Sequence, residues 1–191
     1  METEKPIATL PRLRVATAWL GGCSGCHMSF LDLDEFLIEL AGKVDLVYSP
    51  VIDVKQYPEN VDVCLVEGAV CNEDNLVALR KIRQRTRLVV AFGDCAVTGN
   101  VSAIRNQLGA GNAENVLQWA YVEGAQSNPG LPKEPGIVPA LLERVMPLHE
   151  AVEIDYFLPG CPPPAERIKA LLTQVLEGKP PKLEGLQLKF G

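Results

Sequence analysis

The chain has 191 residues, enough for one domain with its own core, and 18 basic against 24 acidic residues give it a formal charge of −6. This balance argues against a nucleic-acid-binding protein, and no apolar run approaches the ~20 residues that cross a bilayer, so no membrane insertion is expected. The opening residues, METEKPIATLPR, lack the basic and apolar regions of a signal peptide, which predicts a cytoplasmic protein.

The first half of the chain alternates between short apolar runs and amphipathic stretches. Residues 1–11 contain two prolines and several charges and are interpreted as an N-terminal arm. An apolar strand is expected at residues 13–18, followed by a helix at 28–41 with its leucines on one face. The next expected elements are strands at 44–51 and 61–66, a helix capped by Asn72 or Asp74 that runs to about residue 85, and a strand at 88–92.

The second half begins with a loop-rich insertion. Glycines and prolines punctuate residues 99–139, which leaves room for one short helix near residues 112–121. The remaining expected elements are a strand at 153–158, a helix at about 165–176 and an extended C-terminal tail at 178–191. Because strands alternate with helices, residues 12–177 are predicted to form an α/β domain: a doubly wound, flavodoxin-like parallel sheet with flanking helices, in the strand order 2-1-3-4-5.

Four cysteines follow the ends of expected strands. Cys23 and Cys26 come after the first strand in the turn WLGGCSGC, Cys95 after the fourth strand and Cys161 after the fifth. The carboxyl ends of parallel strands meet at one edge, so these sulfurs are expected to converge there. Four sulfurs suit zinc or an iron-sulfur cluster. A zinc ribbon usually pairs two CxxC knuckles, whereas one CxxC with two distant cysteines in Gly/Pro-rich loops favours one [4Fe-4S] cluster.

Glycines stand beside each of these cysteines. Gly22 and Gly25 flank the CxxC, Gly93 precedes Cys95 by two residues, and Gly160 precedes Cys161. Without side chains, these positions would let backbone amides approach the cluster and raise its reduction potential by hydrogen bonding. The four glycines are therefore predicted to support the metal site.

Four motifs in combination resemble the small subunit of nickel-iron hydrogenases: CSGC, VEGAV, GDCAVTGN and LPGCPPP. The 20 kDa subunit of respiratory complex I has a similar pattern, but its homologues typically carry two adjacent cysteines in the first motif. The CxxC therefore favours the hydrogenase. This resemblance covers nearly the whole chain and implies that Cys23, Cys26, Cys95 and Cys161 ligate the proximal [4Fe-4S] cluster.

The resemblance also implies partner subunits. The nickel-iron catalytic centre is carried by a separate large subunit, so no catalytic residue is expected in this chain. A short small subunit with a single cluster resembles cytoplasmic bidirectional enzymes, which couple hydrogen oxidation to NAD+ reduction through a diaphorase module of iron-sulfur and flavin subunits. The expected function is electron transfer within an NAD-linked hydrogenase.

Glu67 and His27 are candidate residues beside the cluster. Glu67, in VEGAV, is interpreted either as a carboxylate that orders the CxxC loop or relays protons, or as a structural acid with satisfied hydrogen bonds. The family often has a Ser-Glu pair where this chain has His27 and Met28. His27 is interpreted either as a hydrogen-bond donor to a ligand sulfur or as a histidine on the helix surface.

Two other functions stay open at this point. The chain also suits an iron-sulfur subunit of a quinone- or ferredoxin-linked dehydrogenase related to complex I, or a metal-stabilised binding module without a redox role. FMN is the less favoured cofactor, because no loop forms a clear phosphate cradle. Among the other residues, Cys64 is expected in the core, and Cys71 near the cluster edge without a ligand role. Trp19 is expected in the core, with stacking on a flavin or contact with a partner subunit as the alternatives.

Overall fold

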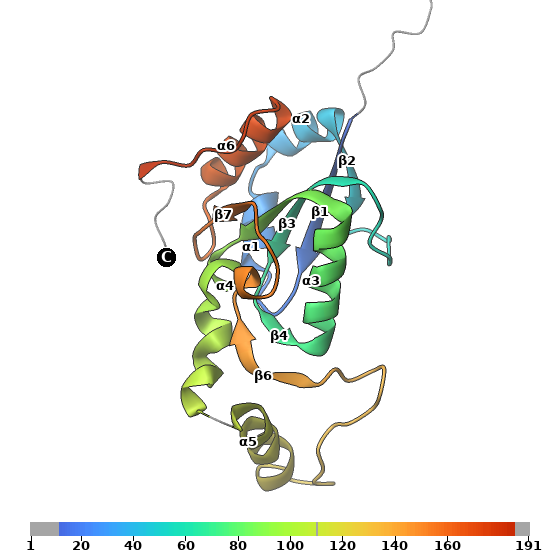
Figure 1. The fold of residues 1–191 in the computed structure, drawn as a ribbon, viewed down its shortest axis with the longest axis vertical. Coiled ribbons are helices and arrows are strands. Elements are labelled where there is room, and N and C mark those ends of the chain that lie inside the picture. The colour runs from blue at the N-terminus through green and yellow to red at the C-terminus, as the bar shows by residue number, and fades with distance from the viewer. Residues whose placement is uncertain (1–11, 110, 186–191) are drawn as a thin grey trace, which may run out of the picture.

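The computed structural model describes residues 12–109 and 111–185, and its larger sheet has five parallel strands in the order β2-β1-β3-β5-β7 (Figure 1). These strands are β1 (Leu13–Trp19), β2 (Val44–Tyr48), β3 (Val61–Glu67), β5 (Thr86–Phe92) and β7 (Tyr156–Leu158). Since β4 and β6 belong to a second sheet, this order is the predicted 2-1-3-4-5. The predicted α/β fold with a doubly wound parallel sheet is therefore confirmed.

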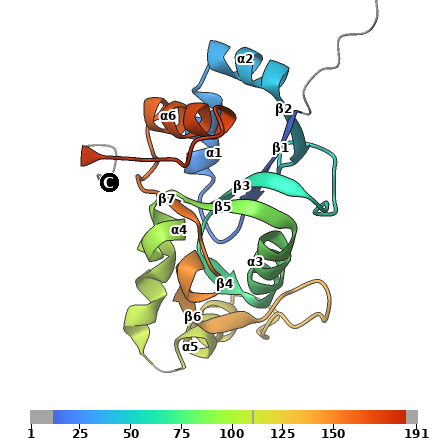
Figure 2. The same cartoon turned by 45° about the horizontal axis from the view of Figure 1, so that its top comes forward.

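Helices cover both faces of this sheet (Figures 1 and 2). One face carries α1 (Gly25–Leu31), α2 (Glu35–Lys43) and α6 (Ala165–Leu176), and the other carries α3 (Glu73–Arg85) and α4 (Asp94–Thr98). Successive side chains of a strand point to opposite faces, so Leu65 joins the core under α1 and α6 whereas Cys64 joins the core under α3. The central strand β3 is consequently buried on both sides.

A second, two-stranded antiparallel sheet pairs β4 (Val70–Asn72) with β6 (Leu141–Met146). The chain between them includes a 3-10 helix, η1 (Asn100–Leu108), then α5 (Asn112–Gln118) and a π-helical turn, η2 (Trp119–Glu123); η3 (Leu148–Glu150) follows β6. Asn106 of η1 exchanges two 2.9 Å hydrogen bonds with the backbone of Val145, as a neighbouring strand would. The short helix predicted near residues 112–121 is confirmed, whereas this small sheet was not predicted.

Several expected elements differ from the structure. The strand expected at 153–158 covers only Tyr156–Leu158, and the region expected as loop with one short helix also contains η1. The predicted single helix at 28–41 is two helices, because Asp34 adopts a left-handed φ of +48° between them. The strand expected at 44–51 ends at Tyr48, two residues before Pro50. By contrast, the expected cap of α3 is confirmed: the side chain of Asn72 accepts a 2.8 Å hydrogen bond from the amide of Asn75.

The expected N-terminal arm, residues 1–11, lies outside the described residues, as do residues 186–191 of the expected tail. Among the helices that the structure describes, none combines the length and apolar character needed to cross a membrane. The division into an arm, a domain at 12–177 and a tail stays a prediction.

Candidate metal centre

The four cysteines predicted as ligands lie at the carboxyl edge of the parallel sheet. Cys23 is in the loop after β1, Cys26 in the first turn of α1, Cys95 in α4 directly after β5, and Cys161 in the loop after β7. Cys26 and Cys95 are buried, whereas Cys23 and Cys161 are exposed, and all are free thiols. The fold therefore places two of the candidate sulfurs inside the protein and two at its surface.

The electrostatics of Cys26 show that these thiols interact. Burial raises the pKa of the Cys26 thiol far above its usual range, and the charges of Glu67, Cys95, Cys23 and Cys161 raise it further. Burial likewise raises the pKa of Cys95, with contributions from Cys161 and Cys23. A thiolate at such a position needs a positive partner, and coordination to a metal supplies one by replacing the proton. The donor chemistry of this edge therefore fits an iron-sulfur cluster.

No group of three or more His, Cys, Asp or Glu side chains within residues 12–109 and 111–185 is arranged to hold a single metal ion. This finding concerns one ion with all its ligands at bonding distance. Each cysteine of a [4Fe-4S] cluster binds a different iron atom, so its ligands surround a larger volume. The four cysteines are thus considered as ligands of a cluster.

Gly93 forms one wall of this site. It has a φ of +86°, and a Cβ atom built at this position would lie 2.1 Å from the Sγ atom of Cys26. A side chain here would displace the Cys26 sulfur, and the left-handed backbone would be strained for any residue with a Cβ. The predicted glycine at this position is therefore required by the position of the sulfur.

The amides of the four predicted glycines have different acceptors. Gly25 donates to the Sγ atom of Cys23 at 3.4 Å. Gly22 donates to the carbonyl of Leu20, Gly93 to the carbonyl of Leu158, and Gly160 to the carboxylate of Asp94. Only the Gly25 amide, among these four, donates to a cysteine sulfur in the described chain, and the other three stabilise the loops that carry the cysteines.

Side-chain hydrogen bonds tie the ligand loops to one another. Asp94 is buried, accepts a 2.6 Å hydrogen bond from the amide of Gly160, and donates its own amide to the Gly160 carbonyl at 2.9 Å. Ser29, buried in α1, donates to the carbonyl of Pro163 at 2.6 Å. Neither residue was predicted from the sequence, although Asp94 lies between Gly93 and Cys95 in one of the four motifs.

Glu67 and His27 form a buried pair at the start of α1. The Oε2 atom of Glu67 accepts a 3.0 Å hydrogen bond from the His27 amide and also contacts the His27 Nδ1 atom. The His27 ring packs edge-on against Phe92, and its Nε2 atom has no hydrogen-bond partner among the described residues. Because His27 is buried, its interpretation as a helix-surface residue is wrong. Glu67 is bonded to the residue that follows the CxxC, an arrangement compatible with both of its interpretations.

The other residues singled out from the sequence have distinct environments. Cys64 is fully buried in the core, as predicted. Cys71 is half-buried and donates to the carbonyl of Gly21 at 3.9 Å. Trp19 is 47% exposed at the end of β1, so the expectation that it packs in the core is wrong.

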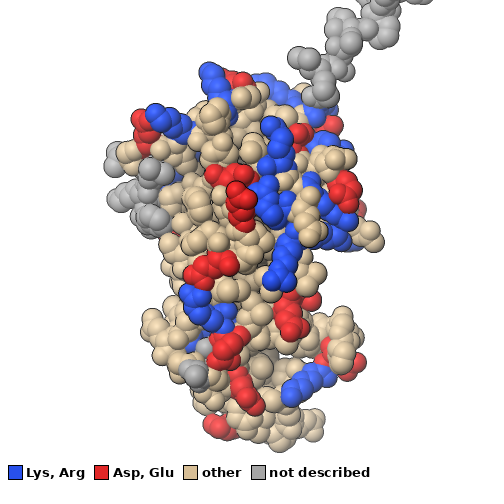
Figure 3. All heavy atoms as spheres, viewed as in Figure 1, with Lys and Arg blue, Asp and Glu red and all other residues tan. Residues whose placement is uncertain are grey.

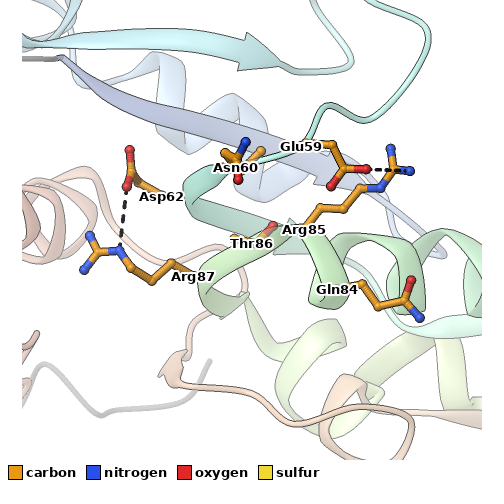
Figure 4. Close-up of a pocket in the computed structure, with 8 residues that line it drawn as sticks. Glu59, Asn60, Asp62, Gln84, Arg85, Thr86 and Arg87 are labelled. Carbon is orange, nitrogen blue, oxygen red and sulfur yellow. Dashed lines mark ion pairs between the residues drawn. The ribbon is translucent and has the colours of Figure 1, made fainter.

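A polar pocket of about 390 Å³ lies at the opposite end of the sheet from the cysteines (Figure 4). Its charged side chains are paired: Arg85 with Glu59 at 2.8 Å, and Arg87 with Asp62 at 3.6 Å. Acidic and basic side chains are also interspersed over the face shown in Figure 3. These charges neutralise one another locally, so the pocket offers no unpaired cation to an anionic ligand.

A model of the protein family described as NADH ubiquinone oxidoreductase, 20 Kd subunit, matches residues 23–175. The chain belongs to this family. The match begins at Cys23 and contains all four candidate ligands.

Curated relatives of the chain include hydrogenase subunits. The chain is 40% identical to the NAD-reducing hydrogenase HoxS subunit delta of Cupriavidus necator, over 88% of this chain and 81% of that protein. It is 37% identical to a subunit of the F420-non-reducing hydrogenase of Methanocaldococcus jannaschii, over 90% of this chain but only 58% of that protein. The chain thus spans little more than half of some relatives.

Two solved structures of hydrogenases also resemble this chain. The fold matches a chain in the crystal structure of an NAD+-reducing [NiFe]-hydrogenase in the H2-reduced state with a TM-score of 0.88 and 43% identity, covering 95% of this chain and 100% of that chain. A chain of the [NiFeSe]-hydrogenase of Dm. baculatum matches with a TM-score of 0.51 and 16% identity, over 86% of this chain and 62% of that chain, which shows the shared fold alone. The expected resemblance to hydrogenase small subunits is confirmed.

Proposed function

We propose that this chain is the electron-transfer small subunit of an NAD-linked nickel-iron hydrogenase, and that Cys23, Cys26, Cys95 and Cys161 hold one [4Fe-4S] cluster. The observation that carries the proposal is the position of these four cysteines, at one edge of a sheet whose fold and sequence match an NAD+-reducing [NiFe]-hydrogenase chain. When bound, such a cluster supplies a site that accepts and releases one electron at a time.

The protein's own contribution is to hold and shield this site. Cys26 and Cys95 are buried, and Cys26 packs in the core under α1 and α6, where apolar side chains exclude water and lower the local dielectric. Cys23 and Cys161 lie at the surface, where a redox partner can approach. Asp94 and Ser29 fix the relative positions of three ligand loops, so the cysteines are preorganised before the metal binds.

The proposed partners are a large subunit with the nickel-iron centre and the iron-sulfur and flavin subunits of a diaphorase, in the cytoplasm. This assignment rests on the similarity to NAD-reducing hydrogenases. Exposed apolar side chains beside the CxxC loop support a docked partner: Trp19 is 47% exposed and Met28 is 59% exposed. Exposed aromatic and methionine side chains are enriched at protein interfaces.

A second candidate function is favoured by the matching family itself, whose description names an NADH ubiquinone oxidoreductase subunit. In that case the chain would hold a cluster in a quinone- or ferredoxin-linked dehydrogenase. The two candidates share the cluster and differ in the partner. Co-purification distinguishes them, because a large subunit that brings nickel supports the hydrogenase and a nickel-free complex supports the dehydrogenase.

The cluster itself is tested on the complex purified without oxygen. We expect the wild-type complex to hold more iron and acid-labile sulfide than the Cys95→Ser complex, by the proportion of one [4Fe-4S] cluster, and to show an EPR signal of this cluster when hydrogen is added. The Cys95→Ser variant should lose this signal, whereas Cys71→Ser should keep it, because Cys71 contacts Gly21 outside the proposed ligand set. Zinc in place of iron, or an unchanged signal in Cys95→Ser, would show that the proposal is wrong.

A further inference from the structure

The side chain of Asn100 contacts one of the proposed ligands directly. Its Nδ2 atom donates a hydrogen bond to the Sγ atom of Cys161 at 3.3 Å. Building on the proposed function, we propose that Asn100 is a positioning residue that sets the reduction potential of the cluster through this N–H···S hydrogen bond. Asn100 was not predicted from the sequence, because no periodicity or spacing marks the first residue of η1 as a donor.

The backbone at Asn100 has a conformation that few residues other than glycine adopt. Asn100 has a φ of +36°, and it follows Gly99, which has a φ of +86°. Non-glycine residues in this region are uncommon, and asparagine tolerates it better than most. Strained conformations of this kind persist where the surrounding structure fixes them, and they are concentrated at functional sites.

The surrounding structure fixes Asn100 from both sides. The amide of Gly99 donates to the carbonyl of Cys95 at 2.9 Å, which anchors the turn to one ligand. Two residues after Asn100, the hydroxyl of Ser102 donates to the carbonyl of Gly21 at 2.7 Å, near the CxxC loop. The chain on either side of Asn100 is thus anchored near the loops of Cys95 and Cys23, while the side-chain amide of Asn100 donates to Cys161.

The chemical effect follows from the charge on the sulfur. A hydrogen bond to a cysteine thiolate withdraws electron density and stabilises the reduced, more negative state of a cluster more than the oxidised state. The side-chain amide of Asn100 is a donor whose nitrogen cannot accept a proton at neutral pH. Cys161 is otherwise exposed, so Asn100 gives this ligand a fixed donor in addition to solvent.

The test compares Asn100→Gly and Asn100→Asp with the neighbouring control Val101→Ala in the complete hydrogenase complex. Glycine keeps the left-handed backbone and removes the donor, and aspartate replaces the donor with an acceptor of nearly the same shape. Val101 is 54% exposed, and no hydrogen bond joins its side chain to a cysteine. EPR-monitored redox titration measures the ratio of reduced to oxidised cluster at a fixed potential.

We expect this ratio to fall by about tenfold in Asn100→Gly, equivalent to 59 mV for a one-electron couple, and by more in Asn100→Asp. Val101→Ala should match the wild type. In D2O-exchanged samples, Asn100→Gly should also lose the ENDOR signal of one exchangeable deuteron near the cluster. Unchanged ratios and spectra in both Asn100 variants would overturn the proposal.

Loss of iron from both Asn100 variants, with Val101→Ala intact, would also overturn the proposal, since Asn100 would then support assembly of the site rather than its potential. Failure of the proposed function has a separate signature. In that case Cys95→Ser would leave the EPR spectrum and iron content of the complex unchanged, whereas failure of the Asn100 proposal leaves the Cys95-dependent signal in place.

Discussion

Asp94 and Gly160 join the loops of two proposed ligands through a reciprocal pair of hydrogen bonds. The Gly160 amide donates to the Asp94 carboxylate at 2.6 Å, and the Asp94 amide donates to the Gly160 carbonyl at 2.9 Å. Asp94 directly precedes Cys95, and Gly160 directly precedes Cys161. The distance between these two sulfurs therefore depends on a carboxylate that the metal does not touch.

Replacing Asp94 tests this dependence. Asp94→Ala leaves the buried Gly160 amide without this acceptor, which we expect to cost about 1–3 kcal/mol of unfolding free energy and about tenfold or more in metal retention. Asp94→Asn keeps an oxygen acceptor of the same shape and should lose much less. Urea unfolding and the rate of iron release to a chelator measure both effects. Equal losses in the two variants would show that the charge of Asp94, rather than its hydrogen bond, is what matters.

Gly93→Ala should prevent the site from assembling. The added Cβ atom would meet the Sγ atom of Cys26, and the positive φ would add strain of about 1–3 kcal/mol. The expected result is a protein without the iron-sulfur absorption band. Gly42→Ala is the matched control, because Gly42 lies in α2 with no heavy atom within 4 Å of its added Cβ. It should keep the cluster and stabilise the fold slightly. A Gly93→Ala protein with full iron content would contradict this account.

The main sheet and the placement of the cysteines at one of its edges were predictable because they follow from periodicity and topology. Buried parallel strands are apolar runs in the sequence. Their carboxyl ends meet at one edge of the sheet, so cysteines that follow these strands lie at that edge. The helix α6 matches its predicted bounds, since its apolar residues recur every three to four positions. These features depend on local pattern and general topology alone.

The missed features depend on contacts between distant residues. The three-residue strand β4 pairs with β6, about 70 residues later, and such short strands have too little periodicity to predict. The break between α1 and α2 at Asp34 interrupts a pattern that is helical throughout. The Glu67–His27 pair joins residues 40 positions apart, and Asn100 and Cys161 are 61 positions apart. No spacing rule within the sequence connects them.

Glu67→Ala should destabilise the start of α1. It removes the acceptor of the buried His27 amide, and we expect a loss of about 1–3 kcal/mol in urea unfolding together with faster loss of iron. Glu67→Gln keeps one oxygen acceptor and should lie between Glu67→Ala and the wild type. The control is Glu59→Gln, which breaks an exposed ion pair with Arg85 and should cost no more than about 1 kcal/mol. Similar losses in Glu67→Ala and Glu59→Gln would contradict a specific role for the buried pair.

Ionisation of the Cys64 thiol should make the free energy of unfolding depend on pH in the alkaline range. Burial raises its pKa from 9.0 to about 12, and the thiol lies in the core between the sheet and α3. Because the folded pKa is above the unfolded value, the neutral thiol contributes its full stability below pH 9. This contribution falls by about 1.4 kcal/mol per pH unit as the pH rises from 9 towards 12, since the unfolded chain releases the proton first.

Cys64→Ala removes this titration, and Val63→Ala is the matched control because Val63 is fully buried in the same strand and does not ionise. Both variants are less stable than the wild type at pH 7, since each leaves a cavity. Between pH 9 and 11 the difference between Cys64→Ala and the wild type should shrink, whereas the difference for Val63→Ala should stay constant. Urea unfolding at pH 7, 9, 10 and 11 measures both differences. If the two differences follow the same pH dependence, the thiolate of Cys64 is tolerated in the folded protein and burial does not control its ionisation.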